Sequence, residues 1–140
     1  MEPGVTTSQL DLELAERFQR LRGELEFTSF GLNFMHLAPG QRGRIHRHER
    51  QEEVYVVLEG ALSVQVEGGE TFEISRGGLA RVAPDLRRQL SNRGAEPVRF
   101  LAVGGGSAHE SRDAVAYEDW DSKEGRTPQD VPLPEDLPTG

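Results

Sequence analysis

The sequence contains no cysteine among its 140 residues. This absence excludes disulfide bonds, thiolate metal sites, thiol nucleophiles and thiol-based redox switches. No apolar run approaches the roughly 20 residues that a membrane-spanning helix requires, so we expect no membrane partner. The first residues lack a basic start followed by an apolar stretch, so we expect no signal peptide and a cytoplasmic location.

Lysine is almost absent as well, since fifteen of the sixteen basic residues are arginine. The net charge of −8 is unevenly spread, because residues 109–140 contribute −6 and residues 1–108 contribute −2. A protein that binds nucleic acid needs a basic face that neutralises phosphates. A nearly neutral body with an acidic end does not predict such a face. We therefore expect no nucleic acid as a partner.

The chain has the length of one domain, and its turn residues divide it into three segments. We expect a helix or arm in residues 1–27, a β-barrel in residues 28–104, and an acidic, proline-containing extension in residues 105–140. Within the middle segment, short β-rich runs are separated by Gly, Pro or Asn every eight to twelve residues, which is typical of a sandwich or barrel. The predicted strands are 30–37, 42–48, 53–58, 62–66, 71–74, 79–83, 88–91 and 97–103. The pattern predicts an all-β jelly roll of about eight antiparallel strands.

Residues 8–22 are predicted to form the N-terminal helix. Ser8 and Asp11 resemble a capping box, and Leu14 and Leu21 fall on one helical face. The leucines in the first half of this segment also alternate as they would in a strand. An extended arm is therefore the alternative.

Two of the four histidines, His46 and His48, stand two positions apart in the predicted strand 42–48. Alternate side chains of a strand share a face, so both imidazoles are expected to point the same way. Glu53 follows five residues after His48, at the start of the next strand. Two imidazoles and one carboxylate can form the facial triad of non-haem iron sites, and the same set suits Zn, Mn or Ni. The spacing therefore predicts a divalent transition-metal site.

The wider spacing around these residues resembles the first sequence motif of the cupin family. Gly40, His46, His48, Glu53 and Gly60 stand at the intervals of that motif. The match includes every fixed position, so it is more specific than the His-x-His pair alone.

The second cupin motif is matched in spacing more than in identity. Its positions fall on Gly77, Ala83, Asp85, Arg88 and Asn92. Ala stands where the family usually has Pro, Asp where it has Gly, and Arg88 where it has the third metal-ligating His, while Asn92 matches. The resemblance covers roughly residues 30–104.

On this resemblance the chain is identified as a small single-domain bacterial cupin. The resemblance implies a conserved barrel that often forms homodimers and holds a metal, here Fe, Mn, Zn or Ni, inside its mouth. The superfamily includes dioxygenases, decarboxylases, sugar isomerases, lyases and non-catalytic binding proteins, so the fold does not name the reaction. We expect the protein to bind a divalent metal and a small oxygenated or anionic molecule. As an enzyme it would convert this molecule.

Arg88 allows two interpretations, because an arginine stays protonated and cannot ligate a cation. In the first, His46, His48 and Glu53 hold a metal, and Arg88 orients an anionic substrate as a substrate-binding and catalytic residue. In the second, no metal is bound, and Arg88 pairs with Glu53 in a non-catalytic binding or sensor barrel. At about 4 Å such a pair attracts by roughly 4 kcal/mol before the cost of desolvation is subtracted.

Three further residues are expected on the same strand faces as these ligands, because they stand an even number of positions away. Arg44 is in phase with His46 and could bind a carboxylate or phosphate of the substrate, or belong to a solvated arginine cluster. Tyr55 and Gln51 are in phase with Glu53, so each could serve as proton donor or hydrogen-bond partner.

The remaining two histidines are weaker candidates. His36, in the strand before the motif, could supply a fourth ligand, although we favour a position on the other side of its sheet or in solvent. His109 stands in the polar extension and is expected to be a surface residue.

Overall fold

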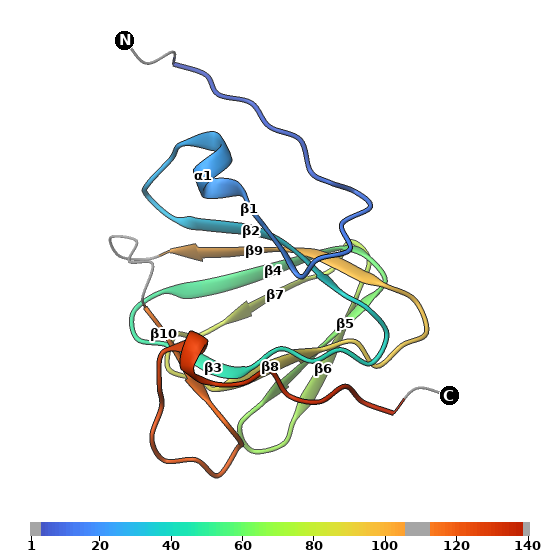
Figure 1. Cartoon of the computed structure of the whole chain (residues 1–140), viewed down its shortest axis with the longest axis vertical. Helices are drawn as coiled ribbons and strands as arrows, with labels where there is room; N and C mark the ends of the chain where they lie inside the picture. Colours follow the sequence, from blue (N-terminus) through green and yellow to red (C-terminus); the bar gives the residue numbers. More distant parts are fainter. Residues whose placement is uncertain (1–3, 106–112, 139–140) are drawn as a thin grey trace.

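Two five-stranded antiparallel sheets face each other in the computed structural model, which describes residues 4–105 and 113–138 (Figure 1). The first sheet runs in the order β1 (Phe18–Arg20), β2 (Gly31–Leu37), β9 (Val98–Gly105), β4 (Glu52–Glu59) and β7 (Leu79–Val82). The second runs in the order β10 (Ala114–Tyr117), β3 (Ile45–His48), β8 (Arg88–Ser91), β5 (Ala61–Val66) and β6 (Thr71–Ser75). The prediction of an all-β fold is confirmed, and all eight strands expected from the sequence are present within a few residues.

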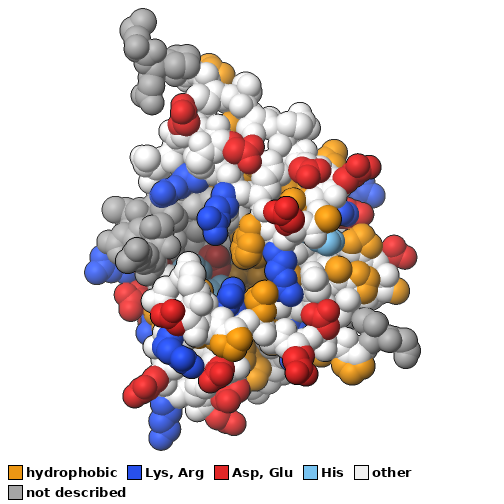
Figure 2. All heavy atoms as spheres, in the orientation of Figure 1, with side chains coloured by type: hydrophobic (Ala, Val, Ile, Leu, Met, Phe, Trp, Pro, Cys, Tyr) orange, Lys and Arg blue, Asp and Glu red, His pale blue; other side chains and the backbone are white. Residues whose placement is uncertain are grey.

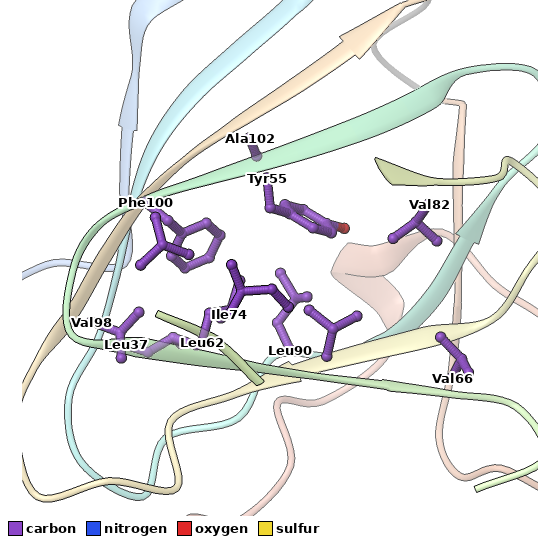
Figure 3. Packing of buried hydrophobic residues seen from close by; sticks show 12 residues of the cluster. Leu37, Tyr55, Leu62, Val66, Ile74, Val82, Leu90, Val98, Phe100 and Ala102 are labelled. Carbon is purple, nitrogen blue, oxygen red and sulfur yellow. The ribbon is translucent and has the colours of Figure 1, made fainter. Parts of the chain in front are cut away.

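The hydrophobic core lies between the two sheets, where the inward-facing apolar side chains of both sheets meet (Figure 3). In β9, Val98, Phe100 and Ala102 are buried while the residues between them are partly exposed. From the second sheet, Leu62 and Leu90 pack against them in the same cluster. This two-residue period is the one a half-buried strand requires. Burying a side chain of the size of Leu or Phe stabilises the fold by about 1.5–3 kcal/mol relative to leaving it exposed.

Glycine at position 60 is required by both backbone conformation and space. Gly60 has a φ of 76°, in the left-handed region, between β4 and β5. A Cβ atom added there would lie 2.4 Å from the carbonyl oxygen of Pro97. The hairpin between β5 and β6 turns at Gly68 and Gly69, with φ of 93° and 94°, the positive values that primed two-residue turns require.

The helix predicted over residues 8–22 is wrong, and the extended arm weighed against it describes the structure. The segment ends in strand β1, which pairs antiparallel with β2, and only α1 (Leu21–Leu25) is helical (Figure 1). The leucines that suggested a helical face are nevertheless buried, because Leu14 and Leu21 pack with Phe34 of β2 on the side of the sheet away from the core. Pairing with β2 provides hydrogen-bond partners for the backbone N–H and C=O groups of β1, so this tertiary arrangement overrides the local helical pattern. Within residues 4–105 and 113–138, no helix combines the length and apolar character needed to span a membrane.

The acidic extension adds a strand that the sequence analysis does not predict. β10 pairs with β3, so that Ala114 lies opposite His48 and Ala116 opposite His46. Tyr117 is buried; its hydroxyl accepts a hydrogen bond of 2.8 Å from Nε of Arg47, and its ring lies 3.6 Å from the guanidinium carbon of Arg87. A short 3-10 helix, η1 (Pro128–Asp130), follows. The extension thus pairs along the edge of β3, the strand that carries both candidate histidine ligands.

Candidate metal centre

Strands β3 and β4 bring His46, His48 and Glu53 together. Nε2 of His46 lies 3.5 Å from Oε1 of Glu53, and Nε2 of His48 lies 3.3 Å from Oε2. One ligand atom of each residue lies within 4.8 Å of the other two. The two imidazoles meet edge to face, with ring centroids 5.4 Å apart. The residues predicted from alternation along two strands therefore converge on one point.

The outer nitrogen, Nδ1, of each imidazole lies near an oxygen atom. Nδ1 of His46 lies 3.1 Å from the carbonyl oxygen of Arg44, and Nδ1 of His48 lies 3.3 Å from Oδ2 of Asp113. The acceptor at Nδ1 of His46 favours the tautomer whose proton is there, which leaves the lone pair on Nε2. Nδ1 of His48 lies at ion-pair distance from Asp113 without the geometry of a hydrogen bond. Nε2 of both histidines faces the Glu53 carboxylate, and a metal ion could lie between these ligand atoms. This donor set fits a divalent transition metal.

The Glu53 carboxylate is held ionised. Burial, the largest influence, would raise the pKa of Glu53, but hydrogen bonds and charge from His46 and His48 together hold the pKa well below its ordinary value. The Tyr55 hydroxyl donates a hydrogen bond to Oε1 of the same carboxylate. Burial, and then the negative charge of Glu53, raise the pKa of Tyr55 well above its usual value, so the phenol keeps its proton and acts as a donor.

Arg88 lies beside Glu53, away from the cavity wall. Its Nη2 is 3.3 Å from Oε1 of Glu53, and its side chain is 0% exposed. Nη1 donates to the carbonyl oxygens of Pro84 at 3.1 Å and Leu86 at 2.7 Å. These contacts fix the guanidinium against the carboxylate. The Arg88–Glu53 pair is thus present, whereas direct contact of Arg88 with a substrate stays a prediction.

Asp113 is a residue of this centre that the sequence analysis misses. It is 3% exposed and accepts hydrogen bonds from the backbone N–H groups of Arg50 and Gln51, each at 3.1 Å. Its Oδ2 also lies 3.3 Å from Nδ1 of His48. Asp113 immediately precedes β10, and no spacing within the motif points to it. The strand pairing of the extension is what brings it to the metal centre.

The three candidate ligands lie at the inner end of a cavity of about 690 Å³. Tyr55 and Gln51 also line this end, as their phase predicted. Gln51 lies close to the neighbouring strand β9, because a Cβ atom added at Gly104 would lie 3.1 Å from its Oε1. Figure 2 shows the opening as a hollow near the centre of the molecular face, with basic side chains gathered around it. A volume of this size accommodates a small metabolite.

Arginines line the outer part of the cavity, which we call the mouth. Arg44 is there, as predicted, and its Nε donates to the carbonyl oxygen of Val131 at 2.6 Å. Three arginines of the N-terminal segment join it, which the sequence analysis does not predict: Arg17, Arg20 and Arg22. Their position follows from the course of the arm, which could not be read from the helical pattern.

His36 does not belong to the centre. Its Nδ1 lies 3.1 Å from the carbonyl oxygen of Ala15 in the arm. On β2, Asn33 and Met35 line the cavity, so His36 faces the other side of the sheet, as favoured. His109 lies outside the described residues.

Comparison with known proteins agrees with this arrangement. A family model described as Cupin domain matches residues 33–104, which include all three candidate ligands. Among curated proteins, no match to the chain is found.

Several solved structures share the fold. A cupin protein from Bacteroides fragilis is 23% identical, with a TM-score of 0.66, and the match covers 96% of this chain and 100% of that chain. A sugar phosphate isomerase of the cupin superfamily from Silicibacter pomeroyi is 25% identical, with a TM-score of 0.60, over 84% of this chain and 79% of that chain. A Cupin 2 conserved barrel domain protein from Salinispora arenicola is 21% identical, with a TM-score of 0.63, over 74% and 90%.

Proposed function

Because the chain belongs to the cupin domain family, we propose that it is a metal-dependent enzyme that converts a small, oxygenated, anionic molecule. His46, His48 and Glu53 would hold the divalent metal, which we expect to be Fe, Mn, Zn or Ni. The observation that carries this proposal is the convergence of these ligand atoms within 4.8 Å at the inner end of the cavity.

A divalent metal in this position would supply Lewis-acid or oxygen-binding chemistry. The protein residues have separate tasks. Arg88 and Tyr55 hold the Glu53 carboxylate from one side, so that its orientation is fixed before any substrate enters. Gln51 offers an amide at the inner end of the cavity for a hydroxyl or carbonyl of the substrate.

The substrate class follows from the charge of the cavity and from one comparison. Arg44 at the mouth can form a bidentate contact with a carboxylate or phosphate. The similarity to a sugar phosphate isomerase supports an anionic, oxygen-rich substrate. Ligand sets of this kind serve oxygenases, isomerases and lyases, so the proposal stands at the level of a small-molecule metalloenzyme.

A second candidate function is a non-catalytic binding barrel without metal. The contact between Arg88 and Glu53 favours it, because the guanidinium supplies a positive charge next to the carboxylate without any metal. In this alternative the arginines of the mouth would bind an anionic ligand that is released unchanged.

We further propose a cytoplasmic homodimer. The edge strands β6 and β7 are joined by a tight turn, and each carries a large exposed apolar side chain, Phe72 at 47% and Leu79 at 66% exposure. Exposed apolar edges of this kind are commonly covered by a partner. Light scattering of the wild type beside Leu79→Glu tests the dimer, which predicts a lower mass for the variant.

The enzymatic proposal is tested by metal loading followed by substrate screening. Protein loaded separately with Fe, Mn, Zn and Ni would be incubated with small sugar phosphates, hydroxy acids and oxo acids, and products followed by NMR. The proposal predicts metal-dependent turnover that Glu53→Gln removes. Tight binding of one of these molecules without turnover, in both loaded and metal-free protein, would favour the binding barrel.

A further inference from the structure

The cavity mouth carries an unbalanced positive charge. Its four arginines come from four places in the chain: Arg17 from the arm, Arg20 from β1, Arg22 from α1, and Arg44 from the residue before β3. In the described part of the chain, none of the four forms an ion pair with a carboxylate. The cavity lining does include Glu53 and Asp113, but both belong to the metal centre at the inner end.

Arginines elsewhere on the protein are placed differently. Arg81 pairs with Glu52, and Arg99 pairs with Glu59. The chain has 24 acidic and 16 basic residues, so carboxylates for pairing are in excess. Four guanidiniums on one rim, none within ion-pair distance of a carboxylate in the described residues, therefore form a local positive field that attracts anions, although the protein has a net charge of −8.

Two of the four guanidiniums are fixed by the backbone. Nη1 of Arg17 donates to the carbonyl oxygen of Arg42 at 2.8 Å, and Nε of Arg44 donates to that of Val131 at 2.6 Å. Each bond uses one of the five N–H donors of a guanidinium, so the others stay available to a ligand. The side chains are oriented in advance, which reduces the entropy lost when an anion binds.

Arg17 and Arg44 also act on each other. Burial lowers the pKa of Arg17, Asp136 raises it, and the positive charge of Arg44 lowers it again. Arg17 is thus near both the negative charge of Asp136 and the positive charge of Arg44, and Asp136 has the larger effect of the two. The acidic extension approaches the neighbouring arginines mainly through carbonyl oxygens, Val131 to Arg44 and Glu135 to Arg42.

We propose that Arg17, Arg20, Arg22 and Arg44 form an oxyanion subsite, which binds a terminal phosphate or carboxylate of the ligand. This inference rests on the proposed function, which puts the reacting end of the ligand at the metal ligands. It specifies the substrate class as a small molecule with a terminal oxyanion. Planar guanidiniums bind such groups through paired hydrogen bonds. The N-terminal arm thus contributes to the binding site as well as covering the outside of the sheet.

Calorimetric titration with defined probes tests the subsite. Glycerol phosphate, inorganic phosphate, succinate and uncharged glycerol would each be titrated into wild type, into Arg17→Gln/Arg22→Gln, and into the matched control Arg76→Gln/Arg93→Gln. The control removes the same charge at two exposed residues that do not line the cavity. We expect the mouth variant to bind the preferred anion at least about tenfold more weakly, the control to change it less than about twofold, and glycerol not to bind.

The probes also distinguish the sources of the oxyanion. Preference for the phosphates assigns a phosphate monoester, and preference for succinate assigns a carboxylate; either result supports the subsite. Equal weakening in the mouth variant and the control would show that only net charge matters and would overturn the proposal. Absence of anion binding at low ionic strength would overturn it as well.

A titration of His46→Ala/His48→Ala separates this inference from the proposed function. The subsite predicts that anion affinity in this variant stays within about threefold of wild type. If the wild type takes up no metal but binds anions in an arginine-dependent way, the proposed function fails and the subsite stands. If metal binds and anion affinity does not depend on the mouth arginines, the subsite fails alone.

Discussion

Nδ1 of His48 lies 3.3 Å from Oδ2 of Asp113, a carboxylate that the C-terminal extension places behind the candidate metal centre. The pairing of β10 with β3 fixes this contact, because Ala114 lies directly opposite His48. A carboxylate behind a histidine ligand fixes its tautomer and increases its basicity. The extension is therefore part of the site, although its acidic composition suggests only a solvent-exposed end.

Replacing Asp113 with alanine is expected to weaken metal binding by about 10–100-fold, since the orientation of His48 is lost. Competition with a fluorescent chelator measures this affinity. Asp113→Asn is the matched variant, because an amide oxygen in the place of Oδ2 can still accept from the backbone N–H groups of Arg50 and Gln51 while the negative charge toward His48 is removed. Wild-type affinity in both variants would contradict the role of Asp113.

Loss of Arg88 is expected to destabilise the metal-free protein strongly. Arg88 is fully buried and Glu53 is nearly so, with side-chain exposures of 0% and 13%. Removing one partner of a buried pair leaves the other charge uncompensated, so Arg88→Leu should lower the free energy of unfolding by about 3 kcal/mol in urea. The exposed pair of Arg81 and Glu52 is the comparison, and Arg81→Leu should cost less than about 1 kcal/mol. Equal decreases in the free energy of unfolding would contradict the larger contribution expected of the buried pair.

Gly60 and Gly69 provide a test of the fold itself. Both have φ in the left-handed region, but a Cβ atom at Gly60 would meet the Pro97 carbonyl oxygen at 2.4 Å, whereas Gly69 has no heavy atom within 4 Å. Alanine at Gly69 should therefore cost only the backbone strain of about 1–2 kcal/mol. Gly60→Ala should cost about 1–3 kcal/mol more, because the backbone must move. Urea unfolding of both variants measures the difference, and equal losses would contradict the approach of Pro97 to Gly60.

The barrel strands and the convergence of the three ligands could be predicted because each depends on local information. Turn glycines mark the ends of the strands, and alternation along β3 is enough to put His46 and His48 on one face. The helix over residues 8–22 was predicted wrongly because Leu14 and Leu21 fit a helical face as well as they fit an outer surface of the sheet. Only the pairing of β1 with β2 decides between these, and that pairing is a long-range contact.

The same reason explains the residues that the sequence analysis missed. Asp113 reaches His48 through the pairing of β10 with β3, and Arg17 and Arg22 reach the mouth through the course of the arm. Neither segment carries a spacing that relates it to the histidine motif. Residues supplied by the two ends of the chain therefore had to be found from the structure.

The binding of a metal by His46, His48 and Glu53 is the central claim, and metal affinity tests it most directly. Untagged protein would be purified without chelator, analysed for metals, and titrated with Fe, Mn, Zn and Ni beside His46→Ala, His48→Ala and the control His36→Ala, whose ring faces the arm. We predict about one equivalent of divalent metal in wild type and His36→Ala, and at least about tenfold weaker binding in each of the other two variants. Metal-free protein that takes up none of these ions, or binding that survives both substitutions, would contradict the account.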